Sequence, residues 1–182
     1  MPLNAIPRIF LVGPMGAGKT TIGRRLALVL QRDFLDSDQE IEQRAGANIP
    51  LIFEVEGETG FRIREKAMIA ELTQRPAIVL ATGGGAILDP DNRRCLVRRG
   101  FVVYLQTSVN EQLSRTCHDH HRPLLQTADP RTRLESLLAI RDPLYREAAD
   151  LIITSDGQSP RAIVQKIIKR IQEDSACLIP AP

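Results

Sequence analysis

The stretch GPMGAGKTT, residues 13–21, follows the apolar run at residues 8–12 and fits the pattern G-x-x-x-x-G-K-[ST]. Its glycines let the backbone curl so that successive amides face a phosphate, and the N-terminus of a following helix adds positive potential. In this pattern Lys19 reaches the β- and γ-phosphates of a nucleotide, and the hydroxyl of Thr20 holds Mg²⁺. We therefore predict a strand, a nucleotide-binding loop and a helix here, in preference to a glycine-rich turn without a ligand. The loop by itself does not identify what receives the phosphate.

The composition is that of one soluble domain. The chain has 182 residues, of which 43% are hydrophobic and 25% charged, and its net charge is only +2. These values argue against a disordered chain and against wholesale attraction to nucleic acid. The apolar runs are far shorter than the roughly 20 residues that span a bilayer, and no signal peptide precedes the first of them. The three cysteines are widely spaced, which favours a reducing compartment. We expect a single domain over residues 1–182, located in the cytoplasm, that binds small anions and neither nucleic acid nor membrane.

Short apolar runs alternate with longer helical patterns along the chain. The strand candidates are residues 8–12, 33–35, 77–81, 101–105 and 151–154, and most of them are continuous apolar runs. Continuous runs are typical of parallel strands that are buried on both faces. We therefore expect an α/β fold, a three-layer α/β/α sandwich around a central parallel five-stranded sheet.

Helical patterns fill the segments between these strands. The first helix opens at Lys19, and the apolar residues that we expect along its buried side are Ile22, Leu26, Val29 and Leu30. Further helices are expected at residues 39–45, 61–74, 93–98, 111–116 and 130–148, and Ser159-Pro160 indicates the N-cap and first turn of a last helix. The polar, proline-containing segment at about residues 117–130 is predicted to be a mobile loop. The tail at residues 175–182 is predicted to be frayed.

The segment FLDSD, residues 34–38, places two carboxylates where the second strand ends. Open α/β sheets bind ligands at the carboxyl ends of their strands, and residues i and i+2 of an extended segment share a face. Asp36 could then serve hydrated Mg²⁺ while Asp38 faces an acceptor hydroxyl. The alternative, a helix N-cap followed by acidic residues in the first turn, is equally consistent with the pattern.

Two further segments offer groups for an acceptor. In GFRIRE, residues 60–65, Arg62 and Glu65 are three apart on a helix, so the carboxylate can orient the guanidinium for bidentate capture of an acid; an ordinary surface pair is the alternative. The segment ATGGGA, residues 81–86, follows the third strand and places Gly83, Gly84 and Gly85 beside the phosphate loop. Glycine there lets the backbone touch a ligand, although a tight turn is the competing explanation.

Two arginines near the end of the chain complete the set. Arg122 lies in HRPLL within the irregular segment, and Arg141 opens RDPLYREAAD. A loop arginine can fold over transferring phosphoryl oxygens and stabilise their charge. Taken singly, each could equally be a solvated surface charge.

Together these segments resemble the shikimate kinase family, over nearly the whole chain from residue 9 to residue 171. The six motifs GPMGAGKTT, FLDSD, GFRIRE, TGGGA, RPLL and RDPLYREAAD occur in the family's order and approximate spacing. The resemblance implies a P-loop kinase fold, a monomer, and transfer of the γ-phosphate of ATP to the 3-hydroxyl of shikimate. The products would be shikimate 3-phosphate and ADP, in the pathway to chorismate and aromatic amino acids.

The same resemblance assigns roles to individual residues. It implies that ATP is bound by Gly16, Ala17, Gly18, Lys19, Thr20, Thr21, Arg115, Arg122, Gln158 and Pro160. It implies that shikimate is held by Asp38, Arg62, Gly83, Gly84, Gly85 and Arg141. Mg²⁺ would be held by Thr20 and, through water, by Asp36. The groups implied in catalysis are Asp38, Lys19 and the lid residue Arg122.

Two other functions and one other site compete with this interpretation. A kinase of the same fold could act on gluconate or a nucleoside monophosphate, but Arg62, Arg141 and the triple glycine argue against it. A nucleotide-dependent switch is a second alternative, and the chain lacks the N-K-x-D motif that reads guanine. The histidine-rich stretch with Cys117, His118, His120 and His121 could bind Zn²⁺, but it lacks a second ligand pair, so solvated lid residues are the better interpretation.

Overall fold

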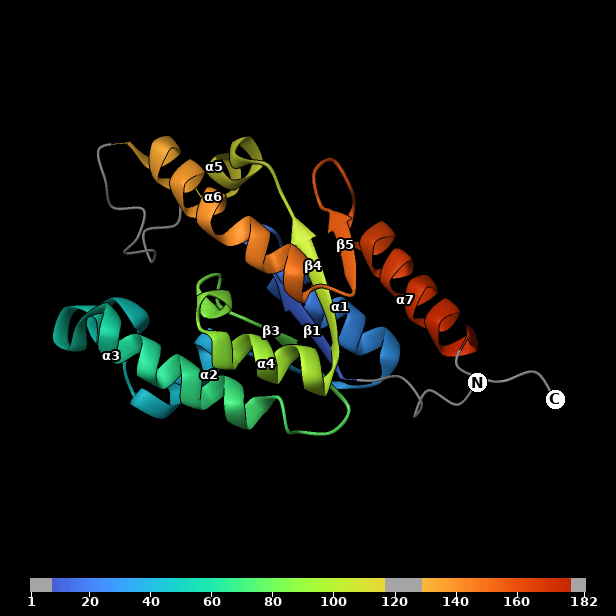
Figure 1. The fold of residues 1–182 in the computed structure, drawn as a ribbon, viewed down its shortest axis with the longest axis horizontal. Helices are drawn as coiled ribbons and strands as arrows, with labels where there is room; N and C mark the ends of the chain where they lie inside the picture. The colour runs from blue at the N-terminus through green and yellow to red at the C-terminus, as the bar shows by residue number, and fades with distance from the viewer. Residues whose placement is uncertain (1–7, 117–128, 178–182) are drawn as a thin grey trace.

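The computed structural model of the chain describes residues 8–116 and 129–177. Its centre is a five-stranded parallel sheet with strand order β2-β3-β1-β4-β5 (Figure 1). The strands are β1 (Ile9–Val12), β2 (Asp33–Asp36), β3 (Ile78–Ala81), β4 (Phe101–Gln106) and β5 (Leu151–Thr154). The five predicted strands are therefore confirmed, and their bounds differ from the prediction by one residue at four of the ten ends.

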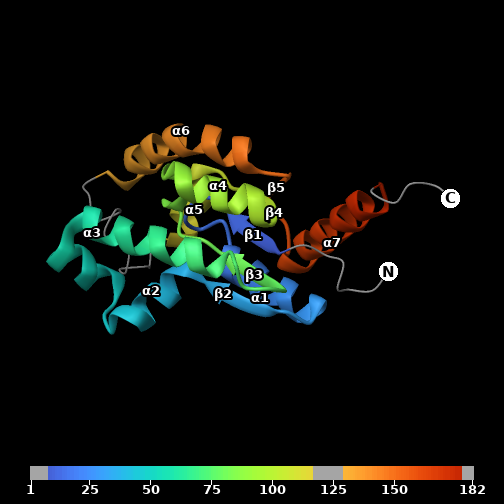
Figure 2. The ribbon, with the colours of Figure 1, turned by 60° about the horizontal axis from the view of Figure 1, so that its bottom comes forward.

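Helices cover both faces of this sheet. They are α1 (Lys19–Leu30), α2 (Ser37–Ala45), α3 (Ile49–Leu72), α4 (Pro90–Arg99), α5 (Val109–Thr116), α6 (Pro130–Ala148) and α7 (Pro160–Cys177), and a short 3₁₀ helix, η2 (Ala86–Leu88), follows β3. Helices α1 and α7 share one core with the sheet, whereas α3, α4 and α6 share the other. Figure 2 shows α6 and α1 on opposite sides of the strands. The predicted three-layer α/β/α sandwich is confirmed.

The central strand β1 is apolar at every position because both of its faces are buried. Ile9 and Leu11 enter the core shared with α1 and α7, and Phe10 and Val12 enter the opposite core. Successive side chains of a strand point to opposite faces, so a strand covered on both sides must be apolar at every position. Its carboxyl end leads directly into the phosphate loop, which places that loop at the edge where open α/β sheets bind ligands.

One detail of the predicted α1 surface is wrong. Val29 is 57% exposed, whereas Ile22, Leu26 and Leu30 are buried as expected. The buried stripe also includes Ala27, so its centre lies near Leu26 and Leu30. At about 100° per residue, Val29 lies roughly a quarter turn from that centre and faces outward.

The third helix begins well before the predicted residue 61. Asn48 caps it by accepting a hydrogen bond from the Leu51 amide at 3.0 Å, and Pro50 stands in its first turn. Gly57 adopts a non-helical φ of 70° that divides the helix at a kink. This left-handed residue interrupts the helical pattern in the sequence, which explains why only the second part of α3 was expected.

The ends of the last two helices also refine the expectations. Asp129 caps α6 by accepting from the Thr132 amide at 3.1 Å, so residues 129 and 130 of the expected lid belong to a helix and its cap. The Ser159 hydroxyl accepts from the Ala162 amide at 3.2 Å, as predicted for an N-cap. Helix α7 runs to Cys177, so residues 175–177 of the expected frayed tail are helical. Within the described residues, the helices are too short or too polar to cross a membrane.

Candidate functional site

The phosphate loop connects β1 to α1 with the geometry that the pattern predicts. Gly13 has a φ of 141°, and a Cβ there would lie 2.5 Å from the Leu105 carbonyl oxygen, so only glycine fits. Gly18 is the N-cap of α1 in the left-handed conformation and provides no side chain for the first amides. A helix N-terminus of this kind presents N–H groups and a positive dipole end to an anion.

Lys19 folds back over this loop. Its Nζ donates to the Gly13 carbonyl at 2.7 Å and to the Pro14 carbonyl at 2.8 Å. A phosphate held by the loop would compete with these carbonyls for the ammonium group, because a charge-assisted bond to an anion is the stronger of the two. Ala17, in contrast, is fully buried in the core beneath the loop, so its side chain does not face a ligand.

Both interpretations of FLDSD hold in part. Strand β2 ends at Asp36, which caps α2 by accepting from the Asp38 amide at 3.1 Å, so Asp38 stands in the first turn of a helix. The two carboxylates therefore do not share a strand face, and that expectation was wrong. The other carboxylate oxygen of Asp36 accepts from the Thr20 hydroxyl at 2.8 Å. A hydroxyl and a carboxylate side by side are oxygen donors of the kind that Mg²⁺ prefers, so these residues fit the ion.

A cleft of about 360 Å³ brings the two halves of the site together. It is lined by Met15, Gly16, Gly18, Lys19, Thr20, Thr21, Asp36, Asp38, Thr82, Gly84 and Arg115. The phosphate loop, the two aspartates and the middle glycine of the triple-glycine segment thus border one space. Sequence reasoning named nine of these eleven residues as site residues, and the other two lie within motifs that it quoted. That they would meet was predictable only because the carboxyl ends of parallel strands lie at one edge of the sheet.

The residues expected on the adenine side are only partly brought to this cleft. Arg115 on α5 donates to the Gly16 carbonyl at 2.9 Å and pairs with Glu111 at 2.8 Å. Gln158 donates to the Thr154 carbonyl at 2.6 Å, and Pro160 is the first residue of α7. Neither Gln158 nor Pro160 lines the 360 Å³ cleft.

Helix α3 presents the predicted ion pair. Arg62 Nη1 lies 2.6 Å from Glu65 Oε2, and the Glu65 side chain is only 1% exposed. Burial raises the pKa of Glu65, and attraction to Arg62 and Arg141 offsets only part of that effect. The other side of the guanidinium donates to Glu58 at 3.1 Å, a contact that the sequence analysis missed although the spacing of four residues indicates it.

Arg141 on α6 lies in the same cluster and is 4% exposed. Burial lowers its pKa, and the neighbouring positive charge of Arg62 lowers it further. Its Nε has no hydrogen-bond partner among the described residues. Two guanidinium groups that are close together and largely removed from water form a site that an anion stabilises.

The triple glycine lies against all of these side chains. A Cβ on Gly83 would lie 2.6 Å from Asp38 Oδ1 and 2.8 Å from Glu65 Oε1, and one on Gly85 would overlap the Arg62 guanidinium. Gly84 lies between them, its Cβ position 3.6 Å from Arg141 Nη1. None of the three has a positive φ, so close approach is what restricts Gly83 and Gly85 to glycine, whereas a Cβ at Gly84 would make only ordinary contacts.

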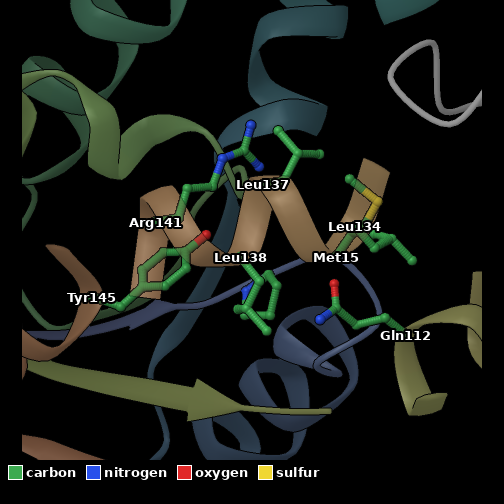
Figure 3. Close-up of a pocket in the computed structure, with 8 residues that line it drawn as sticks. Met15, Gln112, Leu134, Leu137, Leu138, Arg141 and Tyr145 are labelled. Atoms are coloured by element: carbon green, nitrogen blue, oxygen red, sulfur yellow. The ribbon is translucent and has the colours of Figure 1, made fainter. Parts of the chain in front are cut away.

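A small cavity continues from this cluster toward the phosphate loop (Figure 3). Its volume is about 10 Å³, close to the space of one water molecule. It is lined by Pro14, Met15, Gln112, Leu134, Leu137, Leu138, Arg141 and Tyr145. Sequence reasoning did not single out Tyr145, whose hydroxyl donates to the Gly84 carbonyl.

Some predicted site residues lie outside the described part of the chain. Arg122 is one of them, and so is the stretch with Cys117, His118, His120 and His121 that was weighed as a zinc site. Within residues 8–116 and 129–177 no group of three or more histidine, cysteine or acidic residues is arranged to hold a metal ion.

Comparison with known proteins gives a consistent result along the chain. A family model described as shikimate kinase matches residues 15–172. The shikimate kinase of Chromohalobacter salexigens is 58% identical over 168 residues, which cover 92% of this chain and 93% of that protein. The shikimate kinase of Hahella chejuensis is 55% identical over 170 residues, which cover 93% of this chain and 88% of that protein.

A solved structure agrees with these relatives. The shikimate kinase from Acinetobacter baumannii, determined in complex with shikimate, matches the fold with a TM-score of 0.93 and 56% sequence identity. The match covers 94% of this chain and 96% of that one. The similarity therefore extends over most of the chain.

Proposed function

Because the chain belongs to the shikimate kinase family, we propose a role in the family's reaction for each part of the cleft. That reaction transfers the γ-phosphate of ATP to the 3-hydroxyl of shikimate and gives shikimate 3-phosphate and ADP, on the way to chorismate and the aromatic amino acids. One observation carries the assignment of roles: a single cleft joins the phosphate loop to Asp38 and Gly84.

Arg62 and Arg141 bind the carboxylate of shikimate. The guanidinium fork matches a carboxylate bidentately, and a bound anion offsets both the burial of Arg141 and its repulsion from Arg62. Glu65 holds Arg62 in place from the buried side. Glu58, which is 54% exposed, occupies the other side of Arg62 and gives way when shikimate binds.

Asp38 orients the 3-hydroxyl and takes its proton. Its position supports this role, because its carboxylate borders the cleft between the phosphate loop and Gly83. A shikimate molecule whose carboxylate is held by the arginines would lie beside the triple glycine, where Gly84 faces both Arg141 and the phosphate loop. A hydroxyl of the same molecule would then reach Asp38, in reach of a γ-phosphate held at the loop.

The phosphate loop supplies charge neutralisation. Lys19 leaves the loop carbonyls and pairs with the β- and γ-phosphates, while the first amides of α1 hold phosphate oxygens. Thr20 would hold Mg²⁺ directly and Asp36 would hold it through water, and the bound ion would neutralise charge on the phosphates of ATP. Phosphoryl transfer asks mainly for positioning and electrostatic stabilisation, which these groups provide.

The remaining assignments rest on the sequence. We propose that Arg122 belongs to a lid at about residues 117–128 and completes the charge stabilisation, and that Arg115, Gln158 and Pro160 lie near the adenine. The single domain over residues 1–182, the monomeric state and the cytoplasmic location remain proposals as well. Sedimentation equilibrium of the purified chain would test the monomer.

A panel of acceptors tests the substrate assignment. ADP release with Mg·ATP should be rapid with shikimate and at background with gluconate or AMP, because only an acid of the right shape reaches both arginines and Asp38. The Arg141→Ala variant should lose activity at low shikimate, whereas Arg44→Ala should not, because Arg44 pairs with Glu71 in an exposed ion pair between α2 and α3. Equal rates with gluconate would contradict the assignment.

A further inference from the structure

Tyr145 is one of the buried residues with a polar group that these roles do not use. It is 0% exposed and lies four residues after Arg141 on α6, so the two side chains share a face of the helix (Figure 3). Its motif, RDPLYREAAD, contributed only Arg141 to the proposed acceptor site. A tyrosine hydroxyl in the core needs a partner, and the identity of that partner indicates what the residue does.

The partner is the triple-glycine segment. The Tyr145 hydroxyl donates to the carbonyl oxygen of Gly84, which lines the 360 Å³ cleft together with the phosphate loop and Asp38. Burial raises the pKa of Tyr145, so the phenol remains protonated and remains a donor at neutral pH. The bond therefore joins helix α6 to the loop after β3 across 61 residues of chain.

A second tyrosine fixes the ring. Tyr145 stacks on Tyr104 of β4, with ring centroids 4.8 Å apart and planes inclined by 27°. Tyr104 is 0% exposed, and its own hydroxyl donates to Asp142 at 2.7 Å. The sheet thus determines where the Tyr145 ring lies, and the ring determines where its hydroxyl can hold Gly84. Stacked aromatic pairs contribute stabilisation beyond the area that they bury.

We propose that Tyr145 is a positioning residue for the acceptor, holding the Gly83–Gly85 backbone against α6 so that Arg141 and the glycine loop meet shikimate in one fixed arrangement. This inference rests on the proposed acceptor site. Arg141 and the Gly83–Gly85 loop reach shikimate from different parts of the chain. A displacement of either one by a fraction of an ångström would misalign the carboxylate or the hydroxyl of shikimate. The hydroxyl of Tyr145 links α6 directly to this loop through the Gly84 carbonyl.

Tyr145→Phe and Tyr104→Phe form a matched pair for the test. Each removes one buried hydroxyl and keeps the stacked ring, but only Tyr145 bonds the acceptor loop. Leaving the Gly84 carbonyl without its donor should raise KM for shikimate on the order of 10-fold in Tyr145→Phe. KM for ATP should change less than about twofold, and Tyr104→Phe should keep KM for shikimate within about twofold of wild type. Hydrogen exchange at residues 83–88 should be faster in Tyr145→Phe than in Tyr104→Phe.

The outcomes separate this inference from the proposed function. An unchanged KM for shikimate in Tyr145→Phe, or an equal increase in Tyr104→Phe, would overturn the positioning role, because the effect would then be absent or one of general packing. Urea unfolding of both variants checks that they lose similar stability. Arg141→Ala is measured alongside: if that variant also leaves KM for shikimate unchanged, the acceptor site itself is misassigned rather than Tyr145 alone.

Discussion

Replacing Gly83 with alanine should slow phosphoryl transfer while leaving the protein folded. The added Cβ would lie 2.6 Å from Asp38 Oδ1 and 2.8 Å from Glu65 Oε1, whereas ordinary contacts of a Cβ begin at 3.4 Å. The Asp38 carboxylate must therefore retreat by about 0.8 Å or change its rotamer. Glu65 is buried and bonded to Arg62, so most of the adjustment falls on Asp38.

The displacement sets the size of the effect. A misplacement of about 1 Å at a reacting group costs roughly 10²-fold in rate, so kcat should fall by about that factor. Insertion of one methyl group into a packed site costs about 1–3 kcal/mol of stability, which leaves a typical domain folded. KM for ATP should stay close to wild type, because Lys19 and Thr20 are not among the closest neighbours of the new methyl.

Steady-state ADP release and urea unfolding measure the two quantities separately. Gly100→Ala is the matched control, because its Cβ would lie 2.6 Å from the Arg8 carbonyl oxygen, at the opposite end of the sheet from the cleft. It should lose stability without losing kcat. The reasoning is refuted if folded Gly83→Ala retains kcat within about threefold of wild type, or if Gly100→Ala loses as much.

Three further predictions concern the charges around the cleft. Arg62→Ala should raise KM for shikimate much more than KM for ATP, and equal effects on both in a folded variant would remove Arg62 from the acceptor site. Asp36→Asn should raise the Mg²⁺ concentration needed for half-maximal rate more than it lowers the rate at saturating Mg²⁺; an unchanged requirement would leave Asp36 as a helix cap only. Burial raises the pKa of Glu65 in the folded state, so ionisation of this carboxyl group destabilises the fold. The destabilisation is absent below the pKa that Glu65 has in the unfolded chain, and it grows as the pH rises above that value. In urea titrations, the free energy of unfolding of Glu65→Gln minus that of wild type should therefore increase from pH 4 to pH 8. A decrease over this range would show that attraction of the Glu65 carboxylate to the arginines outweighs the effect of its burial.

Local patterns made much of the fold predictable. The phosphate loop and the five strands carry their information in contiguous residues, and the sheet's two-sided burial leaves a plain apolar signal. The start of α3 was missed because Gly57 breaks the helical pattern, although Asn48 and Pro50 offered a start signal. Val29 was wrongly expected to be buried, because the apolar pattern gives the direction of the buried helix face only to within about a quarter turn. Packing against the sheet decides which residues of α1 are buried.

The acceptor site was predictable as a set of residue types rather than as an arrangement. The ion pair of Arg62 and Glu65 follows from a spacing of three residues on one helix. The approach of Gly83 to Asp38, and the bond from Tyr145 to Gly84, join segments 45 and 61 residues apart, and no local pattern encodes them. They depend on how α2, α3 and α6 pack over the ends of the strands.

Asp38→Asn, measured against Asp36→Asn across a Mg²⁺ titration, tests the proposed chemistry most directly. Asparagine keeps the size and can accept a hydrogen bond, but it cannot readily take the proton of the attacking hydroxyl. Loss of a general base costs roughly 10²–10⁴ in rate, and the late proton departure of a loose transition state favours the lower part of that range. Asp38→Asn should therefore lower kcat by about 10²-fold at every Mg²⁺ concentration, with KM for ATP nearly unchanged and KM for shikimate raised only modestly. A near-wild-type kcat in Asp38→Asn would show that Asp38 is not the catalytic base.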